Sequence, residues 1–188
     1  WENIVVTSVQ SGKNRWMQGL SCSDIAAAEG KNPIDAVCDL LSEEKLAVTM
    51  ISFYGSGEVL EKILTHSRAT VGSDGIYGGR PHPRLYGTFP KFIRDFCLDS
   101  NRLSLEAGVR KITSFPAEIL GISDRGILAE GYRADLVLFD PCTLRDTGTY
   151  ENPEQYPEGI KYVFVNGTAV VDEKGCTGAL PGKVLRKR

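Results

Sequence analysis

Apolar residues follow two alternating patterns between residues 3 and 68. Runs rich in β-branched residues, typical of buried strands, cover residues 4–9 and 47–52, and a third run begins at residue 70. The segments between these runs carry apolar residues three and four positions apart, which is the spacing of one helical face. Alternating strands and helices of this kind predict a parallel sheet that is covered by helices.

Capping residues support the helix boundaries in this region. Ser21 and Asp24 stand at capping-box spacing before an alanine-rich run, and Gly30 stands where that helix would stop. Asn32-Pro33 restarts the helical pattern as N-cap and first helical residue, and Ser56 is placed to cap the next helix. The local chemistry therefore agrees with the apolar periodicity.

Residues 73–87 form a long segment of polar and turn-forming residues, SDGIYGGRPHPRLYG. Loops of this length are uncommon inside compact domains and are often functional. Two helices follow: aromatic residues from Phe89 to Phe96 mark the first, and Ser104 caps the second, which ends near Thr113. Gly108 inside the second helix costs roughly 0.5–1 kcal/mol relative to alanine. We therefore expect a close helix contact at Gly108.

The pattern becomes all β after Gly121. Strands are expected at residues 134–139, 161–165 and 168–171, and Asn166-Gly167 between the last two predicts a type I′ hairpin. This change of pattern places a domain boundary near Ile122. Residues 1–121 are expected to form one domain and residues 122–188 a small β domain.

Composition narrows the class of protein. The chain has 188 residues, 41% of them hydrophobic and 24% charged, which suits one globular domain with at most a small appendage. Its 22 basic and 24 acidic residues nearly cancel, which argues against nucleic acid as a partner. The basic cluster of Lys183 and residues 186–188 is expected to be a solvated terminus. No apolar run is long enough to span a membrane, so no membrane partner is expected.

The cysteines indicate the redox environment. They are odd in number and widely spaced, without a Cys-x-x-Cys pair: Cys22, Cys38, Cys97, Cys142 and Cys176. This usage predicts reduced, buried thiols in a cytoplasmic protein rather than a disulfide framework.

The loop at residues 73–87 holds the densest group of candidate catalytic residues. Asp74, His82 and Arg84 could supply a general base, a hydrogen-bond donor and an anion clamp. The alternative is an ordinary turn at residues 73–75, a solvated His82, and an Arg84 that pairs with a surface carboxylate. Composition alone favours this turn interpretation. A complete zinc site is not expected within the chain, because His66 and His82 are its only histidines.

Two stretches of the loop region carry a resemblance to a known family. The run Val71-Gly72-Ser73-Asp74-Gly75 and the run HPRLYGTFP at residues 82–90 resemble the N-acyl-D-amino-acid deacylases of the amidohydrolase superfamily. The similarity continues through GYRADLVLFD at residues 131–140 and VFVNG at residues 163–167. The GYRADLVLFD motif is shared by many amidohydrolases, whereas the His-Pro-Arg stretch is more particular to the deacylases.

The resemblance implies a fold and a set of roles. The fold would be α/β: the C-terminal part of a (β/α)8 barrel followed by a small β-sandwich, with Asp74 after the barrel's last strand. Asp74 would ligate or face zinc, take a proton from the attacking water and pass it to the leaving amine. Arg84 and His82 would bind the substrate, a small N-acyl-D-amino acid, with Arg84 on its α-carboxylate.

The resemblance also implies that part of the family's machinery lies elsewhere. The family's His-x-His, its cysteine ligand and its two later ligand histidines have no counterpart in this sequence. We therefore expect a C-terminal portion of a deacylase that is inactive as an isolated chain. The exposed edges of a half-barrel predict self-association. Two alternatives stay open: a dihydroorotase- or hydantoinase-like cyclic amidase, and a non-catalytic structural module.

Overall fold

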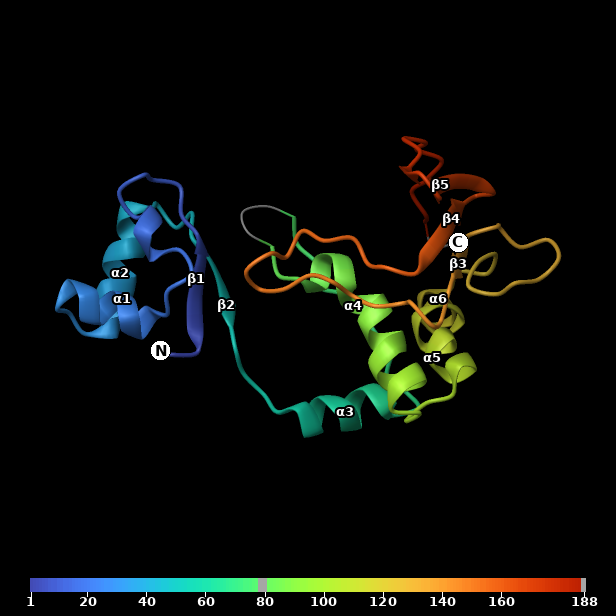
Figure 1. Cartoon of the computed structure of the whole chain (residues 1–188), viewed down its shortest axis with the longest axis horizontal. Coiled ribbons are helices and arrows are strands. Elements are labelled where there is room, and N and C mark those ends of the chain that lie inside the picture. The colour runs from blue at the N-terminus through green and yellow to red at the C-terminus, as the bar shows by residue number, and fades with distance from the viewer. Residues whose placement is uncertain (78–80, 187–188) are drawn as a thin grey trace. The chain divides into compact units, whose positions relative to one another are not determined.

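The computed structural model describes residues 1–77 and 81–186 (Figure 1). The chain divides into two compact units, one of residues 1–60 with 75–82, and one of residues 61–74 with 83–188. The boundary expected near Ile122 lies inside the second unit, and as a domain boundary it stays a prediction. Residues 78–80 of the expected loop, and Lys187 and Arg188 of the expected basic cluster, lie outside the described residues.

The first unit contains the strands and helices that the apolar pattern predicts. Its elements are β1 (Ile4–Ser8), the 3₁₀ turn η1 (Arg15–Met17), α1 (Cys22–Glu29), α2 (Pro33–Glu43) and β2 (Thr49–Ser52). The capping box of Ser21 and Asp24 is present at the start of α1, and Gly30 ends that helix in the left-handed conformation with φ 66°. Asn32 caps α2 through a bond from the Asp35 main-chain nitrogen. These local predictions are confirmed.

The predicted parallel arrangement of the strands is wrong. β1 and β2 are antiparallel, with Ile4 opposite Ser52 and Val6 opposite Met50. Residues 70–72 form no strand, and the Val71 main-chain nitrogen donates instead to the Lys111 carbonyl at 3.4 Å. The apolar pattern could identify strand segments, but it carries no information on the direction of the neighbour, which long-range packing determines.

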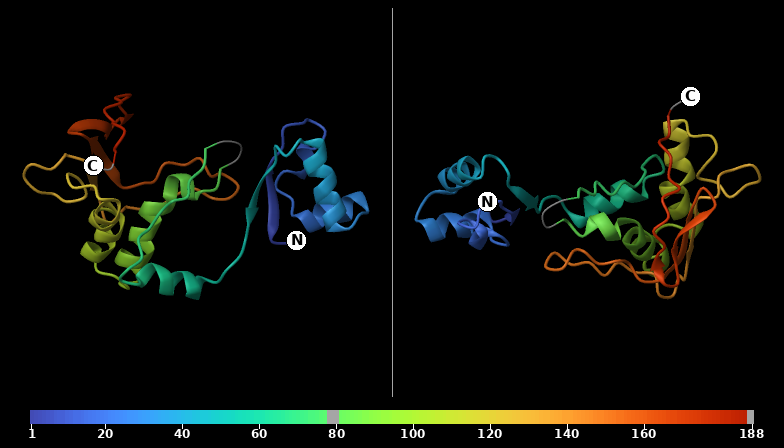
Figure 2. Two further views of the ribbon diagram at one scale, coloured as in Figure 1. Left: turned by 180° about the vertical axis from the view of Figure 1, so that it is seen from behind. Right: turned by 90° about the horizontal axis from the view of Figure 1, so that it is seen from above.

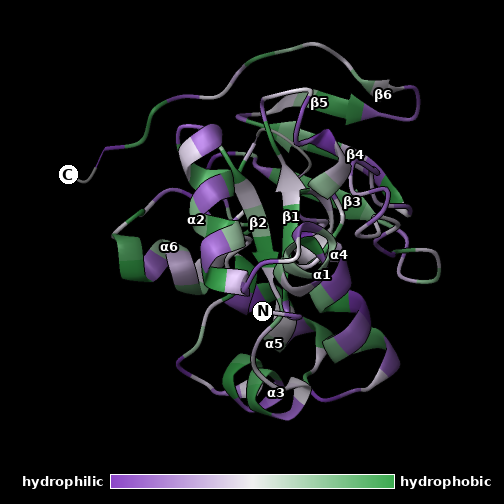
Figure 3. Ribbon diagram, turned by 90° about the vertical axis from the view of Figure 1, so that its left-hand side faces the viewer, coloured by the Kyte–Doolittle hydropathy of each residue, from purple (hydrophilic) through white to green (hydrophobic). Residues whose placement is uncertain are grey.

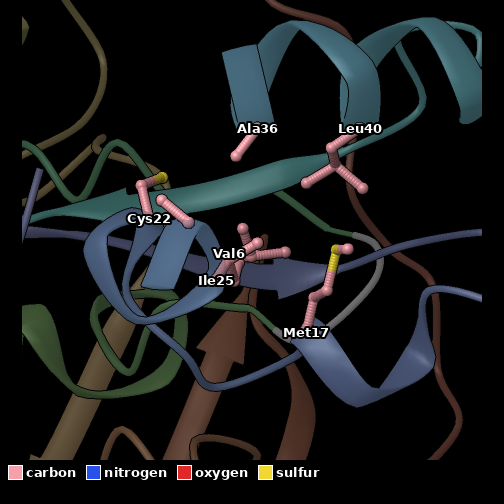
Figure 4. Packing of buried hydrophobic residues seen from close by; sticks show 7 residues of the cluster. Val6, Met17, Cys22, Ile25, Ala36 and Leu40 are labelled. Atoms are coloured by element: carbon pink, nitrogen blue, oxygen red, sulfur yellow. The ribbon is translucent and has the colours of Figure 1, made fainter. Parts of the chain in front are cut away.

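A closed apolar core holds the first unit together. Both α1 and α2 lie on one side of the strand pair, as Figure 1 and the left view of Figure 2 show. The buried residues of the core come from both helices, β1 and η1 (Figure 4): Val6, Met17, Cys22, Ile25, Ala26, Ala36 and Leu40. Fully burying a side chain such as isoleucine or leucine stabilises a fold by about 1.5–3 kcal/mol.

Glu44 ties the loop of residues 10–14 to the end of α2. The residue is only 4% exposed, and Oε2 accepts hydrogen bonds from the main-chain nitrogens of Gln10 at 2.7 Å and Ser11 at 2.9 Å. The Ser11 hydroxyl also donates to this carboxylate, as does Asn14 Nδ2 at 2.8 Å. The side-chain and main-chain bonds from Ser11 are the main cause that lowers the pKa of Glu44 to about 2.

The second unit combines helices with an antiparallel sheet. Its elements are α4 (Arg84–Phe92), the π-helical turn η2 (Ile93–Asp99), α5 (Leu105–Ile112), α6 (Ser114–Leu120), β3 (Leu136–Phe139), β4 (Ile160–Val165), β5 (Thr168–Asp172) and β6 (Gly175–Cys176). The division between the units falls within α3 (Gly57–Thr65). Ser56 caps α3 and Ser104 caps α5 as predicted, each by accepting a main-chain hydrogen bond.

The hairpin prediction is also confirmed. The sheet order is β3-β4-β5-β6, and each neighbouring pair is antiparallel. Asn166 and Gly167 connect β4 to β5 with φ values of 49° and 80°, which are the two positive values of a type I′ turn. The sequence pattern sufficed here because turn chemistry and strand alternation are both local.

The core of the second unit lies between the helices and the sheet. Phe92, Ile93, Cys97 and Leu144 are buried in it, with Phe139 of β3 and Ile160 of β4 packed against them. An added Cβ at Gly108 would lie 2.2 Å from Cys97 Sγ, so the close contact of α5 with η2 is confirmed.

The cysteines only partly match their prediction. All five are free, but Cys38, Cys142 and Cys176 are exposed, so the expected burial is wrong for these three. They lie at exposed helix, loop and sheet-edge positions, which their wide spacing did not distinguish from core positions. None of the helices in the described part of the chain is long and apolar enough to cross a bilayer.

Candidate functional site

Asp74 and Arg84 meet in the second unit. Asp74 follows residues 70–72, which belong to no helix or strand, and its φ of 46° is in the left-handed region that few residues other than glycine adopt. Arg84 is the first residue of α4. The Asp74 carboxylate contacts Arg84 at the start of α4.

Arg84 holds both the side chain and the main chain of Asp74. Its Nη2 lies 2.6 Å from Asp74 Oδ2, and its Nε donates to the Asp74 carbonyl at 2.9 Å. The two side chains are 40% and 77% exposed. Because exposed ion pairs contribute little to stability, this contact is better understood as fixing an orientation. The turn interpretation expected Arg84 to pair with a surface carboxylate, and the structure shows that this carboxylate is Asp74 itself.

The start of α4 is supported by the loop of residues 141–158. An added Cβ at Gly87 would lie 2.8 Å from Asp146 Cβ, and the Tyr86 and Tyr156 rings meet edge to face with centroids 5.7 Å apart. Arg94 donates to the carbonyl of Leu144 at 2.6 Å and to that of Pro141 at 3.1 Å. The first turn of α4 and the η2 turn that follows the helix are therefore both held by this loop.

Lys111 fixes the segment that leads into Asp74. This residue of α5 is 5% exposed, and its Nζ donates to the carbonyls of His66 and, at 2.8 Å, Ala69. Burial, with a smaller contribution from Arg110, lowers the pKa of Lys111. The sequence analysis missed both Lys111 and Arg94. A lysine three positions after Gly108, on the helical face that packs inward, was the available signal.

The third predicted site residue stays a prediction. His82 is half-buried and belongs to the first unit, whereas Asp74 and Arg84 belong to the second. Within residues 1–77 and 81–186, no three His, Cys, Asp or Glu side chains are grouped to hold a metal ion. Asp74 carries the carboxylate that was expected to ligate or face zinc, and Arg84 contacts it at Oδ2.

The second unit also contains a large apolar groove of about 880 Å³. It is lined by residues of α4, α5 and the sheet, among them Phe89, Ile112, Val137 and Val163, and neither Asp74 nor Arg84 belongs to its lining. Its walls are mostly apolar, and its ionisable lining residues are Tyr86, Asp135, Tyr156, Asp172, Glu173 and Cys176. The groove and the Asp74–Arg84 pair are therefore made of different residues.

Comparison with known proteins places this chain in a family. A model described as "amidohydrolase family" matches residues 16–171. The chain belongs to the amidohydrolase family, and the resemblance to the N-acyl-D-amino-acid deacylases is confirmed by its relatives. The D-aminoacylase of Alcaligenes xylosoxydans xylosoxydans is 38% identical over 172 residues, which are 91% of this chain and 34% of that protein.

Solved structures agree with this assignment. A crystal structure of D-aminoacylase matches 94% of this chain and 36% of its own, with 35% identity and a TM-score of 0.85. The N-acyl-D-glutamate deacylase of Bordetella bronchiseptica, complexed with zinc and a phosphonate inhibitor that mimics the tetrahedral intermediate, matches 90% of this chain and 34% of its own. Its identity is 33% and its TM-score 0.80. An α/β amidohydrolase fold fits these neighbours, and the chain spans about a third of the relatives' length.

Proposed function

We propose that this chain is the C-terminal portion of a zinc-dependent N-acyl-D-amino-acid deacylase. The intact protein would hydrolyse the amide of an N-acyl-D-amino acid to a D-amino acid and a carboxylate. The observation that supports this most is the Asp74–Arg84 pair, which lies in the two stretches that most resemble the deacylases. The isolated chain is proposed to be inactive.

Asp74 is proposed as the catalytic carboxylate. A carboxylate held in one orientation can take a proton from the attacking water and pass it to the leaving amine nitrogen. The contact of Arg84 with Oδ2 and with the main-chain carbonyl supports this role, because it holds the carboxylate in one orientation.

Arg84 and His82 are proposed to bind the substrate. Guanidinium groups bind carboxylates in two-pronged geometry, which suits the substrate's α-carboxylate. In this structure Arg84 uses Nε and Nη2 on Asp74, so a substrate carboxylate would compete with Asp74 for the guanidinium. His82 would add a hydrogen-bond donor from the same loop.

The proposed cofactor is zinc, for which Asp74 fits as one oxygen ligand. Bound zinc lowers the pKa of water toward 7 and polarises the scissile carbonyl. The remaining ligands would come from residues outside this chain, since no grouping of three donor side chains occurs in the described ranges. The complete fold would be a (β/α)8 barrel with a small β-sandwich.

Self-association is proposed as a second property, supported by exposed apolar residues. On α3, Val59, Leu60 and Ile63 are 53–55% exposed, and Figure 3 shows hydrophobic and hydrophilic segments alternating along this helix. On the edge strand β3, Val137 and Leu138 are 55% and 56% exposed. A location in the cytoplasm is likewise proposed, on the strength of the five free thiols.

A substrate panel tests the proposed function. The full-length, zinc-loaded protein would be assayed on N-acetyl-D-amino acids, their L-enantiomers, and cyclic imides. We expect hydrolysis of the D-substrates with little activity on the other two classes. A preference for cyclic imides would show instead that the protein is a cyclic amidase. Inactivity on all three substrate classes would favour a non-catalytic structural module.

A further inference from the structure

Lys111 is buried with its ammonium group directed at main-chain carbonyls. Lysine is almost never fully buried without a partner. Across residues 1–77 and 81–186, no carboxylate forms an ion pair with Lys111. The carbonyls of His66 and Ala69 are therefore the groups that stabilise the buried ammonium of Lys111.

These carbonyls lie where α3 ends. The Ala69 main-chain nitrogen donates to the His66 carbonyl at 3.1 Å, and the His66 main-chain nitrogen donates to the Ile63 carbonyl at 3.1 Å. The helix therefore finishes in a tight turn. A helix C-terminus carries partial negative charge and unpaired carbonyls, and a cation placed there is stabilising. The buried ammonium of Lys111 thus joins the end of α3 to α5.

The main chain of Lys111 binds the same segment. Its carbonyl accepts a hydrogen bond from the Val71 nitrogen at 3.4 Å. Residues 66–71 are therefore attached to α5 by both the side chain and the main chain of one residue. Asp74 follows three residues later, and Arg84 holds it from α4. The turn that carries Asp74 is fixed at both of its ends.

We propose that Lys111 is a positioning residue for Asp74. By binding the carbonyls of His66 and Ala69 it directs the chain into residues 72–74 and so places the Asp74 carboxylate against Arg84. This inference rests on the proposed function, in which Asp74 moves the proton.

The first test uses the 188-residue chain and does not depend on activity. Lys111→Met keeps the apolar stem and removes the donors, while Lys62→Met removes a lysine from the last turn of α3 as a matched control. The readout is the NMR signal of the Arg84 Nε–H group, assigned by its loss in Arg84→Lys. We expect the signal to move toward that of a solvated arginine in Lys111→Met and to stay unchanged in Lys62→Met. An unchanged signal in folded Lys111→Met would overturn the inference.

The second test uses the full-length, zinc-loaded enzyme. We expect Lys111→Met to lower kcat by about 10–100-fold with KM within about threefold, because a small misplacement of a catalytic group costs up to about 100-fold. A merely structural role would reduce the yield of folded protein but leave the kcat of that protein unchanged. Lys111→Gln, which keeps one donor, replaces Lys111→Met in both tests if the methionine variant does not fold.

The two proposals can fail separately. If Asp74→Ala is inactive but Lys111→Met has normal kcat and a normal Arg84 signal, the positioning role is wrong and the proposed function stands. If Asp74→Ala is fully active, the catalytic role proposed for Asp74 is wrong, and the Arg84 signal alone then shows whether Lys111 positions this residue; the substrate panel tests the proposed function separately.

Discussion

The two compact units differ in how completely they bury their apolar residues. In the first unit, two helices close over a strand pair, and Glu44 binds the adjoining loop through four hydrogen bonds. The second unit has a smaller buried core, a groove of about 880 Å³ and an edge strand with exposed apolar residues. The less closed unit is the one that carries Asp74 and Arg84. The more closed core and the Asp74–Arg84 pair therefore belong to different units.

The two units can be followed separately in solution. Both tryptophans, Trp1 and Trp16, lie in the first unit, so tryptophan fluorescence reports on that unit alone. Far-UV circular dichroism reports on both. A substitution in the second unit is therefore expected to change the dichroism transition and leave the fluorescence transition in place.

The largest effect is expected for Gly159→Ala in the second unit. Gly159 has φ +83°, and an added Cβ would lie 2.5 Å from both the Cα and the main-chain nitrogen of Leu144. Backbone atoms cannot yield as a flexible side chain can, so we expect a loss of about 3 kcal/mol or more. Urea unfolding followed by dichroism measures it. Gly182→Ala, with open space around its Cβ, is the control. Equal stability of the two variants would show that the loop of residues 141–158 is not packed as described.

A smaller loss of about 1–3 kcal/mol is expected for Gly108→Ala, because its Cβ would overlap Cys97 Sγ. Cys97→Ala removes that sulfur, so the double variant should recover most of the loss. In the double variant, the higher helix propensity of alanine relative to glycine, about 1 kcal/mol, then adds to the stability. A double-mutant cycle by urea unfolding measures the coupling. Additive effects of the two substitutions would contradict the close contact of α5 with η2.

The smallest effect is expected in the first unit and depends on pH. The pKa of Glu44 is lowered from 4.5 to about 2, so the ionised form is favoured by folding. This contribution is present above about pH 4.5 and is lost as the pH falls toward 2. Fluorescence-detected unfolding at several pH values should show a shallower acid dependence for Glu44→Gln. Glu29→Gln, whose carboxylate pairs with Lys31 at the surface, should keep the original dependence. The same acid dependence in both variants would contradict the role of Glu44.

The features that the sequence predicted are those with local causes. The caps at Ser21, Asn32 and Ser104 and the turn at Asn166-Gly167 depend on residues within a few positions of one another. The direction of the strand pair could not be predicted, because β1 and β2 are joined across two helices and apolar alternation is the same for either direction.

The candidate site shows the same limit. The motif identified Asp74 and Arg84 as residues of interest, but their mutual contact joins residues ten positions apart, which a motif alone does not place. The contribution of Lys111 could not be predicted, since its partners are main-chain carbonyls that leave no mark in the sequence. An inward-facing lysine in an amphipathic helix is the feature that would have drawn attention to it.

The kcat of Asp74→Ala in the full-length, zinc-loaded protein tests the central claim most directly. We predict a fall of at least about 10²–10⁴-fold on an N-acetyl-D-amino acid, the usual contribution of a positioned general acid–base, with little change in zinc content or fold. Asp39→Ala, which removes an exposed carboxylate of α2 that pairs with Lys31, should retain full activity. Retention of more than about a tenth of wild-type kcat by Asp74→Ala would contradict the assignment of the proton transfer to Asp74.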